Sequence, residues 1–138
     1  MLCLKTSVKL FANPKTEAQH QMNVIRWSMA VRDTYPELCL LHHIPNGGSR
    51  DPIEAKRLKD QGVKAGVPDL CLPVARGQYH GMYIEMKTET GKTSPEQDWW
   101  VEEISRQGYF VEVCHGWESA VRTLEWYMNL TVEKRGGK

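Results

Sequence analysis

The sequence predicts one α/β domain in which a mixed β-sheet is flanked by helices. Three observations support this fold class. Helical and strand patterns alternate along the chain in the order helix, strand, helix, two strands, helix, strand, helix. The length of 138 residues suffices for one hydrophobic core and does not suggest a second module. No internal repeat or low-complexity segment interrupts the pattern.

The first 15 residues are expected to be an extension that precedes the domain. Apolar and polar side chains alternate over residues 2–11, which predicts a short extra strand. After a break at Asn13-Pro14, Thr16 and Gln19 form a capping-box pattern and predict a helix that ends near residue 32.

The next two expected elements are a strand and a helix. The short apolar segment 38–44 predicts the strand, and the turn-forming sequence Pro45-Asn46-Gly47-Gly48 follows it. Asp51 is a typical N-terminal cap, and Pro52 suits the first helical position. These signals predict a helix that begins after Asp51 and ends at Gly62.

A β-hairpin and a third helix are expected in the middle of the chain. The hairpin would combine residues 69–74 with residues 79–87 around a polar turn. Ser94 caps the helix that follows, and Gly108 ends it.

The last expected elements are a strand over residues 109–114 and an amphipathic helix over residues 117–128. Residues 131–138 form a polar tail, so the domain itself is expected to span residues 16–130.

The charge composition argues against a uniformly basic DNA-binding surface. The chain has 18 basic and 17 acidic residues and a formal net charge of +1. Any affinity for nucleic acid must therefore come from local patches, such as the group Lys56, Arg57, Lys59 and Lys64 around the second helix. A solvated helix face explains this group equally well.

The four cysteines lie far apart and include no Cys-x-x-Cys pair. They are therefore expected to be buried thiols and not zinc ligands. No apolar run reaches the length of a membrane span, and the first residues lack the long apolar stretch of a secretion signal. We therefore expect a cytoplasmic protein that does not enter a membrane.

Three charged residues form the strongest candidate site. Asp69 opens one apolar segment, and Glu85 and Lys87 lie in the next. Because side chains alternate along a strand, Glu85 and Lys87 project from the same face. Two carboxylates can hold Mg²⁺ or Mn²⁺ for hydrolysis of a phosphodiester, and a nearby lysine can stabilise charge or help to deprotonate water. The alternative is a purely structural ion pair between Glu85 and Lys87.

The chain resembles the virus-type replication-repair nuclease domain, VRR-NUC, of the PD-(D/E)XK nuclease superfamily, in its small stand-alone phage or bacterial form. The resemblance covers roughly residues 17–128 and implies the restriction-endonuclease-like core of that superfamily. It rests on an ordered set of motifs: Ile44-Pro45-Asn46-Gly47-Gly48-Ser49-Arg50, Gly62-Val63-Lys64-Ala65-Gly66-Val67-Pro68-Asp69, Glu85-Met86-Lys87, Ser94-Pro95-Glu96-Gln97 and Gly108-Tyr109-Phe110-Val111-Glu112-Val113.

The resemblance also implies roles for residues beside the central three. Glu17 would be a further acidic metal ligand, and the backbone carbonyl of Met86 would complete the ligand set. Gln97 would orient the attacking water or the substrate phosphate. Simpler explanations exist, because an acid suits the first turn of a helix and Gln97 completes a capping box with Ser94.

The glycine-rich turn is a candidate DNA contact. Its members Asn46, Gly47 and Gly48 can approach a phosphate backbone closely, although a tight turn alone would also need glycine. Basic residues that could bind phosphates nearby are Arg50, Lys64 and Lys92.

Together these features predict a Mg²⁺- or Mn²⁺-dependent endodeoxyribonuclease. The resemblance implies a homodimer that acts on branched DNA such as four-way (Holliday) junctions, in a bacterial or phage-infected host cell. Three alternatives remain: an inactive DNA-binding or assembly module with the same fold, a nuclease that acts on flaps or duplex DNA, and a restriction-like enzyme with a sequence-specific target. The intact Asp69, Glu85 and Lys87 favour an active enzyme.

Overall fold

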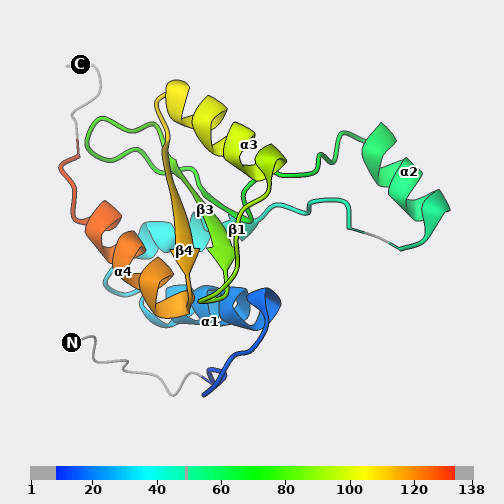
Figure 1. Cartoon of the computed structure of the whole chain (residues 1–138). Coiled ribbons are helices and arrows are strands. Elements are labelled where there is room, and N and C mark those ends of the chain that lie inside the picture. The colour runs from blue at the N-terminus through cyan, green and yellow to red at the C-terminus, as the bar shows by residue number, and fades with distance from the viewer. Residues whose placement is uncertain (1–8, 49, 133–138) are drawn as a thin grey trace.

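The computed structural model describes residues 9–48 and 50–132. Within them, four strands form one mixed sheet (Figure 1): β1 (His42–His43), β2 (Leu70–Leu72), β3 (Met82–Lys87) and β4 (Phe110–His115). They lie side by side in that order, with antiparallel β1–β2 and β2–β3 pairs and a parallel β3–β4 pair. The predicted α/β class with a mixed sheet is confirmed.

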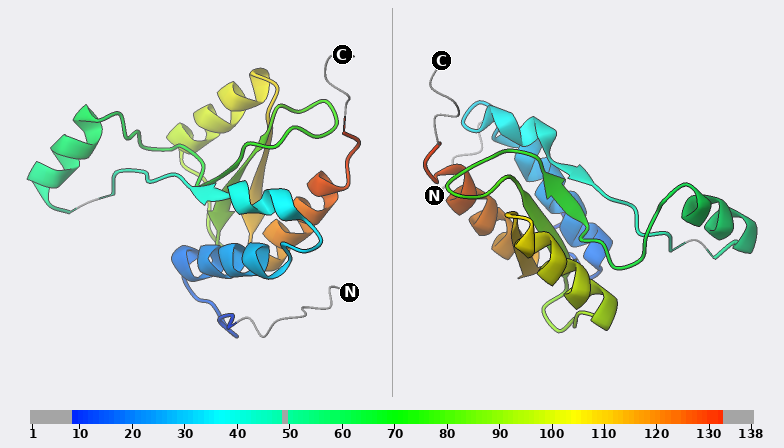
Figure 2. Two further views of the ribbon diagram at one scale, coloured as in Figure 1. Left: turned by 180° about the vertical axis from the view of Figure 1, so that it is seen from behind. Right: turned by 90° about the horizontal axis from the view of Figure 1, so that it is seen from above.

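Helices cover both faces of the sheet (Figure 2). α1 (Glu17–Ala30) and α4 (Trp117–Met128) lie on one face, together with the short 3₁₀ helix η1 (Pro36–Leu40). α3 (Pro95–Arg106) connects β3 to β4 and lies over the opposite face. The side-chain caps predicted from the sequence begin α1 and α3. The Thr16 hydroxyl accepts from the Gln19 N–H in α1, and Ser94 and Gln97 form a complete capping box in α3.

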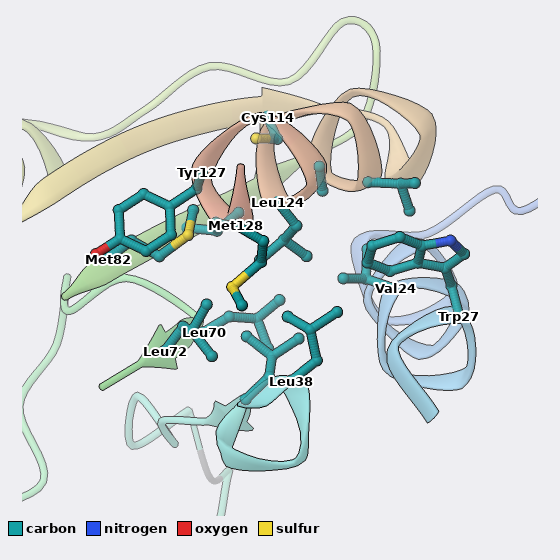
Figure 3. Close-up of a cluster of buried hydrophobic side chains, with 14 of the residues drawn as sticks. Val24, Trp27, Leu38, Leu70, Leu72, Met82, Cys114, Leu124, Tyr127 and Met128 are labelled. Atoms are coloured by element: carbon teal, nitrogen blue, oxygen red, sulfur yellow. The ribbon is translucent and has the colours of Figure 1, made fainter. Parts of the chain in front are cut away.

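The hydrophobic core lies on the α1 and α4 side of the sheet (Figure 3). Alternate residues of β3 contribute to it, because Met82, Ile84 and Met86 are almost completely buried. α3 contributes no buried residue. The core joins side chains from α1, η1, all strands but β1, and α4, among them Val24, Trp27, Leu38, Leu70, Leu72, Cys114, Leu124 and Tyr127. The opposite face of the sheet carries Glu85 and Lys87 of β3 together with Tyr83, Val111 and Val113.

The predicted strand over residues 38–44 is wrong over most of its length. Residues 36–40 form η1, and only His42 and His43 pair with β2. Pro36 at the start of η1 favours a helical turn, because its fixed φ angle suits the first helical position. The turn buries Leu38 and leaves Leu40 exposed. It also exposes Cys39, which corrects the expectation that this thiol is buried.

The predicted strand over residues 2–11 falls largely outside the described residues. Its described end, residues 9–11, is not a strand and is tied to α1. The buried Asn23 side chain accepts from the Phe11 N–H and donates to the Phe11 carbonyl. Arg26 donates to the Lys9 carbonyl and lies over the Phe11 ring. This segment therefore packs beside the first helix.

An extended arm, whose described residues are 45–48 and 50–66, projects from the body of the molecule (Figure 1). It carries α2 (Pro52–Asp60), which begins at the predicted Asp51 cap and buries none of its residues. The arm is attached at both ends. The Ile44 N–H donates to the Asp69 carbonyl, and the Trp100 indole N–H of α3 donates to the Ala65 carbonyl.

Among the helices of the described residues, none is long and apolar enough to cross a membrane.

We expect Gly66→Ala to destabilise the protein more than Gly62→Ala. Both glycines have positive φ angles, +90° and +101°, which strain any other residue by roughly 1–2 kcal/mol. A Cβ on Gly66 would also lie 2.9 Å from Glu96 Cβ and from Trp100 Cδ1 of α3, whereas one on Gly62 would meet nothing within 4 Å. The clash should add about 1–3 kcal/mol. Urea unfolding of both variants measures the difference in their free energies of unfolding. Equal losses of stability would contradict the close approach of Gly66 to α3.

Candidate active site

The pairing of β2 with β3 brings two carboxylates together. Leu70 lies opposite Ile84, so the same register, extended by one residue, places Asp69 opposite Glu85. Directly opposite residues of an antiparallel pair share a face, with Cβ atoms about 5 Å apart. Leu70 and Ile84 face the core, so Asp69 and Glu85 lie on the face covered by α3.

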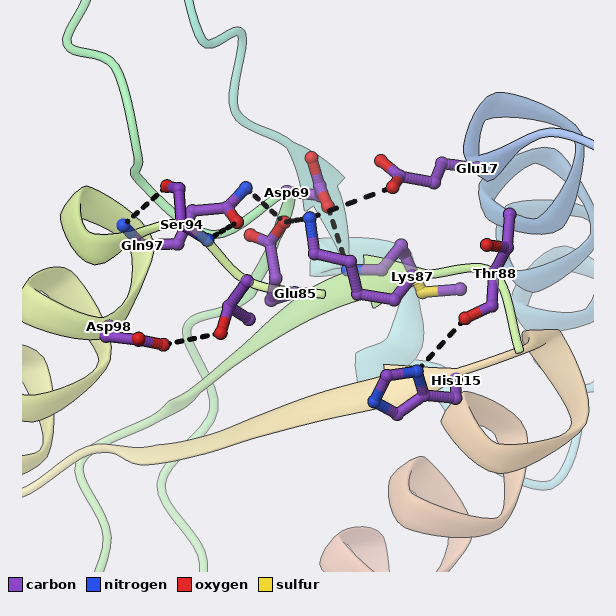
Figure 4. Close-up of polar contacts among 11 residues, drawn as sticks. Glu17, Asp69, Glu85, Lys87, Thr88, Ser94, Gln97, Asp98 and His115 are labelled. Atoms are coloured by element: carbon purple, nitrogen blue, oxygen red, sulfur yellow. Dashed lines mark hydrogen bonds and ion pairs between the residues drawn. The ribbon is translucent and has the colours of Figure 1, made fainter. Parts of the chain in front are cut away.

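Glu85 is the most enclosed charged residue of this face. Only 2% of its surface is exposed. Its Oε1 atom accepts a hydrogen bond of 2.9 Å from the Gln97 side-chain amide, and no donor among the described residues is bonded to its buried Oε2 atom (Figure 4). A buried oxygen that accepts no hydrogen bond is costly when it is ionised, which indicates a position that a proton or a cation would satisfy.

Lys87 lies between two acids and is itself buried. Its Nζ atom is 3.5 Å from Glu85 Oε1 and 3.7 Å from Glu17 Oε1 (Figure 4). Glu17 comes from the first turn of α1 and is half exposed, so α1 reaches the site at the end of β3. The ammonium group offsets part of the negative charge of the three acids.

Asp69 is held by its backbone and its side chain. Its Oδ2 atom accepts the Met86 N–H at 2.8 Å, across the strand pair. Its carbonyl accepts the Ile44 N–H at 2.7 Å and lies 2.8 Å from His43 Nδ1. His43 is a positioning contact that the sequence analysis missed, because no local signal shows which residue β1 brings beside Asp69.

Gln97 performs two structural tasks at once. Its Oε1 atom accepts the Ser94 N–H, which completes the capping box of α3, and its Nε2 atom donates to Glu85 (Figure 4). The start of α3 is thereby fixed relative to the carboxylate. The two expected explanations of Gln97, a cap and a site residue, are geometrically compatible.

The electrostatics of the site favour a bound cation. Burial raises the pKa of Glu85 to about 8, the negative charge of Asp69 and a hydrogen bond to the Asp69 side chain add to this shift, and Lys87 opposes it. A cation would take the place of the proton that Glu85 holds in the metal-free protein, and two facing carboxyl groups are hard oxygen ligands that fit Mg²⁺ or Mn²⁺. Among the described residues, no group of three or more His, Cys, Asp or Glu side chains is arranged to hold a metal. Glu17 contacts Lys87, and its predicted role as a third acidic ligand stays a prediction.

The residues predicted to contact DNA fall into three places. Asn46, Gly47 and Lys64 line one depression at the base of the arm. Gly48 and Arg50 are exposed farther along the arm. Lys92 is exposed on the loop that joins β3 to α3. The structure therefore brings half of this set together and leaves the other half apart.

We expect the metal-free protein to lose stability as the pH rises from about 4.5 to about 8. Folded Glu85 keeps its proton up to a pKa of about 8, whereas the unfolded chain releases it near 4.5. In that range the folded state binds more protons, so the free energy of unfolding falls with rising pH. Glu85→Gln should remove this fall, which is on the order of a few kcal/mol. Urea unfolding in EDTA measures it, with the exposed Glu102→Gln as control. A wild-type slope equal to that of Glu85→Gln would contradict the raised pKa.

The comparisons with known proteins identify the family of this chain. The family model described as the VRR-NUC domain matches residues 15–118, which include both carboxylates, Lys87 and Gln97. A solved structure named "VRR_NUC domain protein" is 32% identical to this chain and superimposes with a TM-score of 0.72. The match covers 86% of this chain and 93% of that one. No curated protein matches the sequence. The chain therefore belongs to the VRR-NUC family of nuclease domains.

Proposed function

We propose that this protein is a metal-dependent endonuclease that hydrolyses phosphodiester bonds in DNA. The observation that carries the proposal is the buried Glu85 carboxyl group, which faces Asp69 across the strand pair and has one oxygen that accepts no hydrogen bond from the described residues. A structural ion pair with Lys87 would not need a second carboxylate beside it. Because the chain belongs to a family of nuclease domains, we assign phosphodiester hydrolysis to this pair of carboxyl groups.

The proposed ligands are the carboxylates of Asp69 and Glu85, the backbone carbonyl of Met86 and the carboxylate of Glu17. A bound Mg²⁺ or Mn²⁺ would polarise the scissile phosphate and lower the pKa of water. Lys87 Nζ, which lies between Glu85 and Glu17, would stabilise charge on the phosphate as an ammonium group or, as a neutral amine, take up a proton from the attacking water. Family chemistry would leave a 5′-phosphate and a 3′-hydroxyl.

The side-chain amide of Gln97 would add a hydrogen-bond donor to the charged groups of the proposed site. It holds Glu85 Oε1 from the side of α3, so that Oε2 is the oxygen left for a ligand. In the catalytic complex the same amide would orient the attacking water or the substrate phosphate. A hydrogen-bond donor fixed by a helix cap loses little freedom when substrate binds.

The proposed substrate is branched DNA, and the proposed active form is a homodimer. The small net charge and the single domain favour recognition of DNA shape, and two symmetric active sites can cut opposed strands. The apolar stripe of α4 is used in the protein's own core, but Trp126 of α4 stays 47% exposed. It lines a depression of about 420 Å³ beside β4, a place where a second copy could pack. Cellular or phage DNA would be met in the cytoplasm.

We expect the protein to cut four-way junctions faster than linear duplex, and only with Mg²⁺ or Mn²⁺ present. The measurement is cleavage of labelled duplex, flap, fork and junction DNA with either metal or with EDTA. Asp69→Asn and Glu85→Gln should abolish cleavage, because each removes a charged oxygen ligand. Asn is the better variant at position 69, since its side-chain oxygen can still accept the Met86 N–H.

Light scattering should give the mass of a dimer at micromolar concentration. A monomer that cuts junction and duplex equally fast would contradict the branched-DNA proposal and leave the nuclease standing. Metal-dependent cleavage by the folded Asp69→Asn and Glu85→Gln variants would contradict the proposed site itself. Flap or duplex cleavage in preference to junctions would favour the other nuclease functions considered from the sequence.

Lys87→Ala should slow cleavage by roughly 10²-fold or more and leave metal affinity nearly normal, a scale typical of lost acid–base assistance. Lys87→Arg should not restore the rate, because a guanidinium keeps the charge but does not exchange a proton near neutral pH. Single-turnover cleavage measures the rate, and circular dichroism checks the fold, since Lys87 is paired with a buried acid. A fully active Arg variant would show that the position requires only charge.

A further inference from the structure

A depression of about 510 Å³ lies at the base of the arm, away from the carboxylates. Asn46 and Gly47 of the outgoing segment form one wall, and Val63, Lys64 and Ala65 of the returning segment form another. Ala55 and Lys59 of α2 close the far end. Three stretches of the arm therefore build one concave surface.

The two segments of the arm meet closely at Gly47. Its φ angle is +74°, and a Cβ there would lie 3.3 Å from Val63 Cγ1. A glycine lets the outgoing turn rest against Val63, so the wall is formed by packed residues. The outgoing segment is joined to the body by the bond from the Ile44 N–H to the Asp69 carbonyl, and the returning segment by the bond from the Trp100 indole N–H of α3 to the Ala65 carbonyl. One hydrogen bond thus joins each segment that lines the depression to the body that carries the carboxylates.

Basic charge is concentrated in the arm. Residues 45–66 contain five basic and three acidic residues, a formal charge of +2 against +1 for the whole chain. On α2, Lys56 pairs with Asp60 at 2.7 Å, and Arg57 lies 3.8 Å from Glu54. Within the described part of the chain, Lys59 and Lys64 have no ion-pair partner. These two unpaired lysines are the ones that line the depression.

We propose that this depression binds the sugar-phosphate backbone of the DNA substrate. Lys59 and Lys64 would each bind a backbone phosphate, and the Asn46 amide can donate to a phosphate oxygen. The small apolar side chains of Ala55, Val63 and Ala65 offer a surface that suits a deoxyribose ring. The inference rests on the proposed nuclease function for its choice of DNA as the ligand.

The phosphate bound by Lys64 would lie near the cleavage point. Lys64 precedes Asp69 by five residues, which span at most about 18 Å between Cα atoms. One strand of DNA rises 3.4 Å per nucleotide, so this distance and the reach of the two side chains together place that phosphate within roughly ten nucleotides of the cut. The arm then sets the position of the strand in the active site without reading its bases.

The test compares two double variants of equal charge change. The first double variant, Lys59→Gln with Lys64→Gln, removes the two unpaired lysines that line the depression. The control, Lys56→Gln with Arg57→Gln, removes the two paired cations of α2. Anisotropy of a labelled duplex and a labelled four-way junction in EDTA, from about 50 to about 200 mM salt, gives affinity and salt dependence without cleavage.

The first double variant should weaken binding on the order of tenfold or more and lower the slope of log K against log salt by about 2. The control should change the slope by much less. In cleavage assays with metal, the first variant should raise KM and leave kcat nearly unchanged, because the lysines lie outside the carboxylate site. The single variants Lys59→Gln and Lys64→Gln should each give about half of the slope change.

Equal effects of the two double variants would overturn the inference, even if the protein cuts DNA. Unchanged DNA affinity together with a loss of the dimer would also overturn it and would assign the arm to contacts between copies of this chain. If the wild type binds DNA with the expected lysine dependence but never cuts it, the phosphate site stands and the proposed nuclease function fails.

Discussion

The carboxylate pair depends on one strand register, the antiparallel alignment of β2 with β3. A slip of one residue would turn Glu85 into the hydrophobic core and Ile84 towards α3. The core prevents this slip, because Leu70, Leu72 and Ile84 are almost fully buried. β2 has only three residues, and the Ile44 and His43 contacts to the Asp69 carbonyl extend its attachment beyond them. Apolar packing on one face of the sheet therefore positions the polar chemistry on the other.

The site is a local exception to the rule that charges stay in water. Burial and the facing Asp69 both oppose ionisation of Glu85, and Lys87 offsets this only in part. A fully neutralised cluster would be more stable and would have less affinity for a cation. α3 takes part through Gln97, which is held by the cap of its own helix. Because α3 buries no residue in the core, its attachment relies on such contacts, including that between Trp100 and Ala65.

Local signals predicted those parts of the fold that local physics determines. Thr16, Asp51 and Ser94 cap the helices that the sequence assigned to them, and the alternation along β3 separates its apolar face from Glu85 and Lys87. The strand predicted over residues 38–44 was wrong, because an apolar run beside a proline fits either a strand or a helical turn. The proximity of His43 to Asp69 follows from strand pairing, which periodicity does not reveal. The caps of α2 likewise predict a helix but not that it stands apart from the core.

That separation has a consequence for how such a protein can diversify. A helix that buries nothing imposes almost no packing requirement on its own sequence, so substitutions, insertions or a change in its length leave the central sheet undisturbed. The arm is joined to the body at the Asp69 carbonyl and at Trp100 of α3. A change in the shape of the arm would therefore change which molecules can approach the carboxylates. The arm could therefore be replaced, by evolution or by design, with an arm of another shape. The domain would then act on a differently shaped target. The chemistry in the sheet would stay as it is.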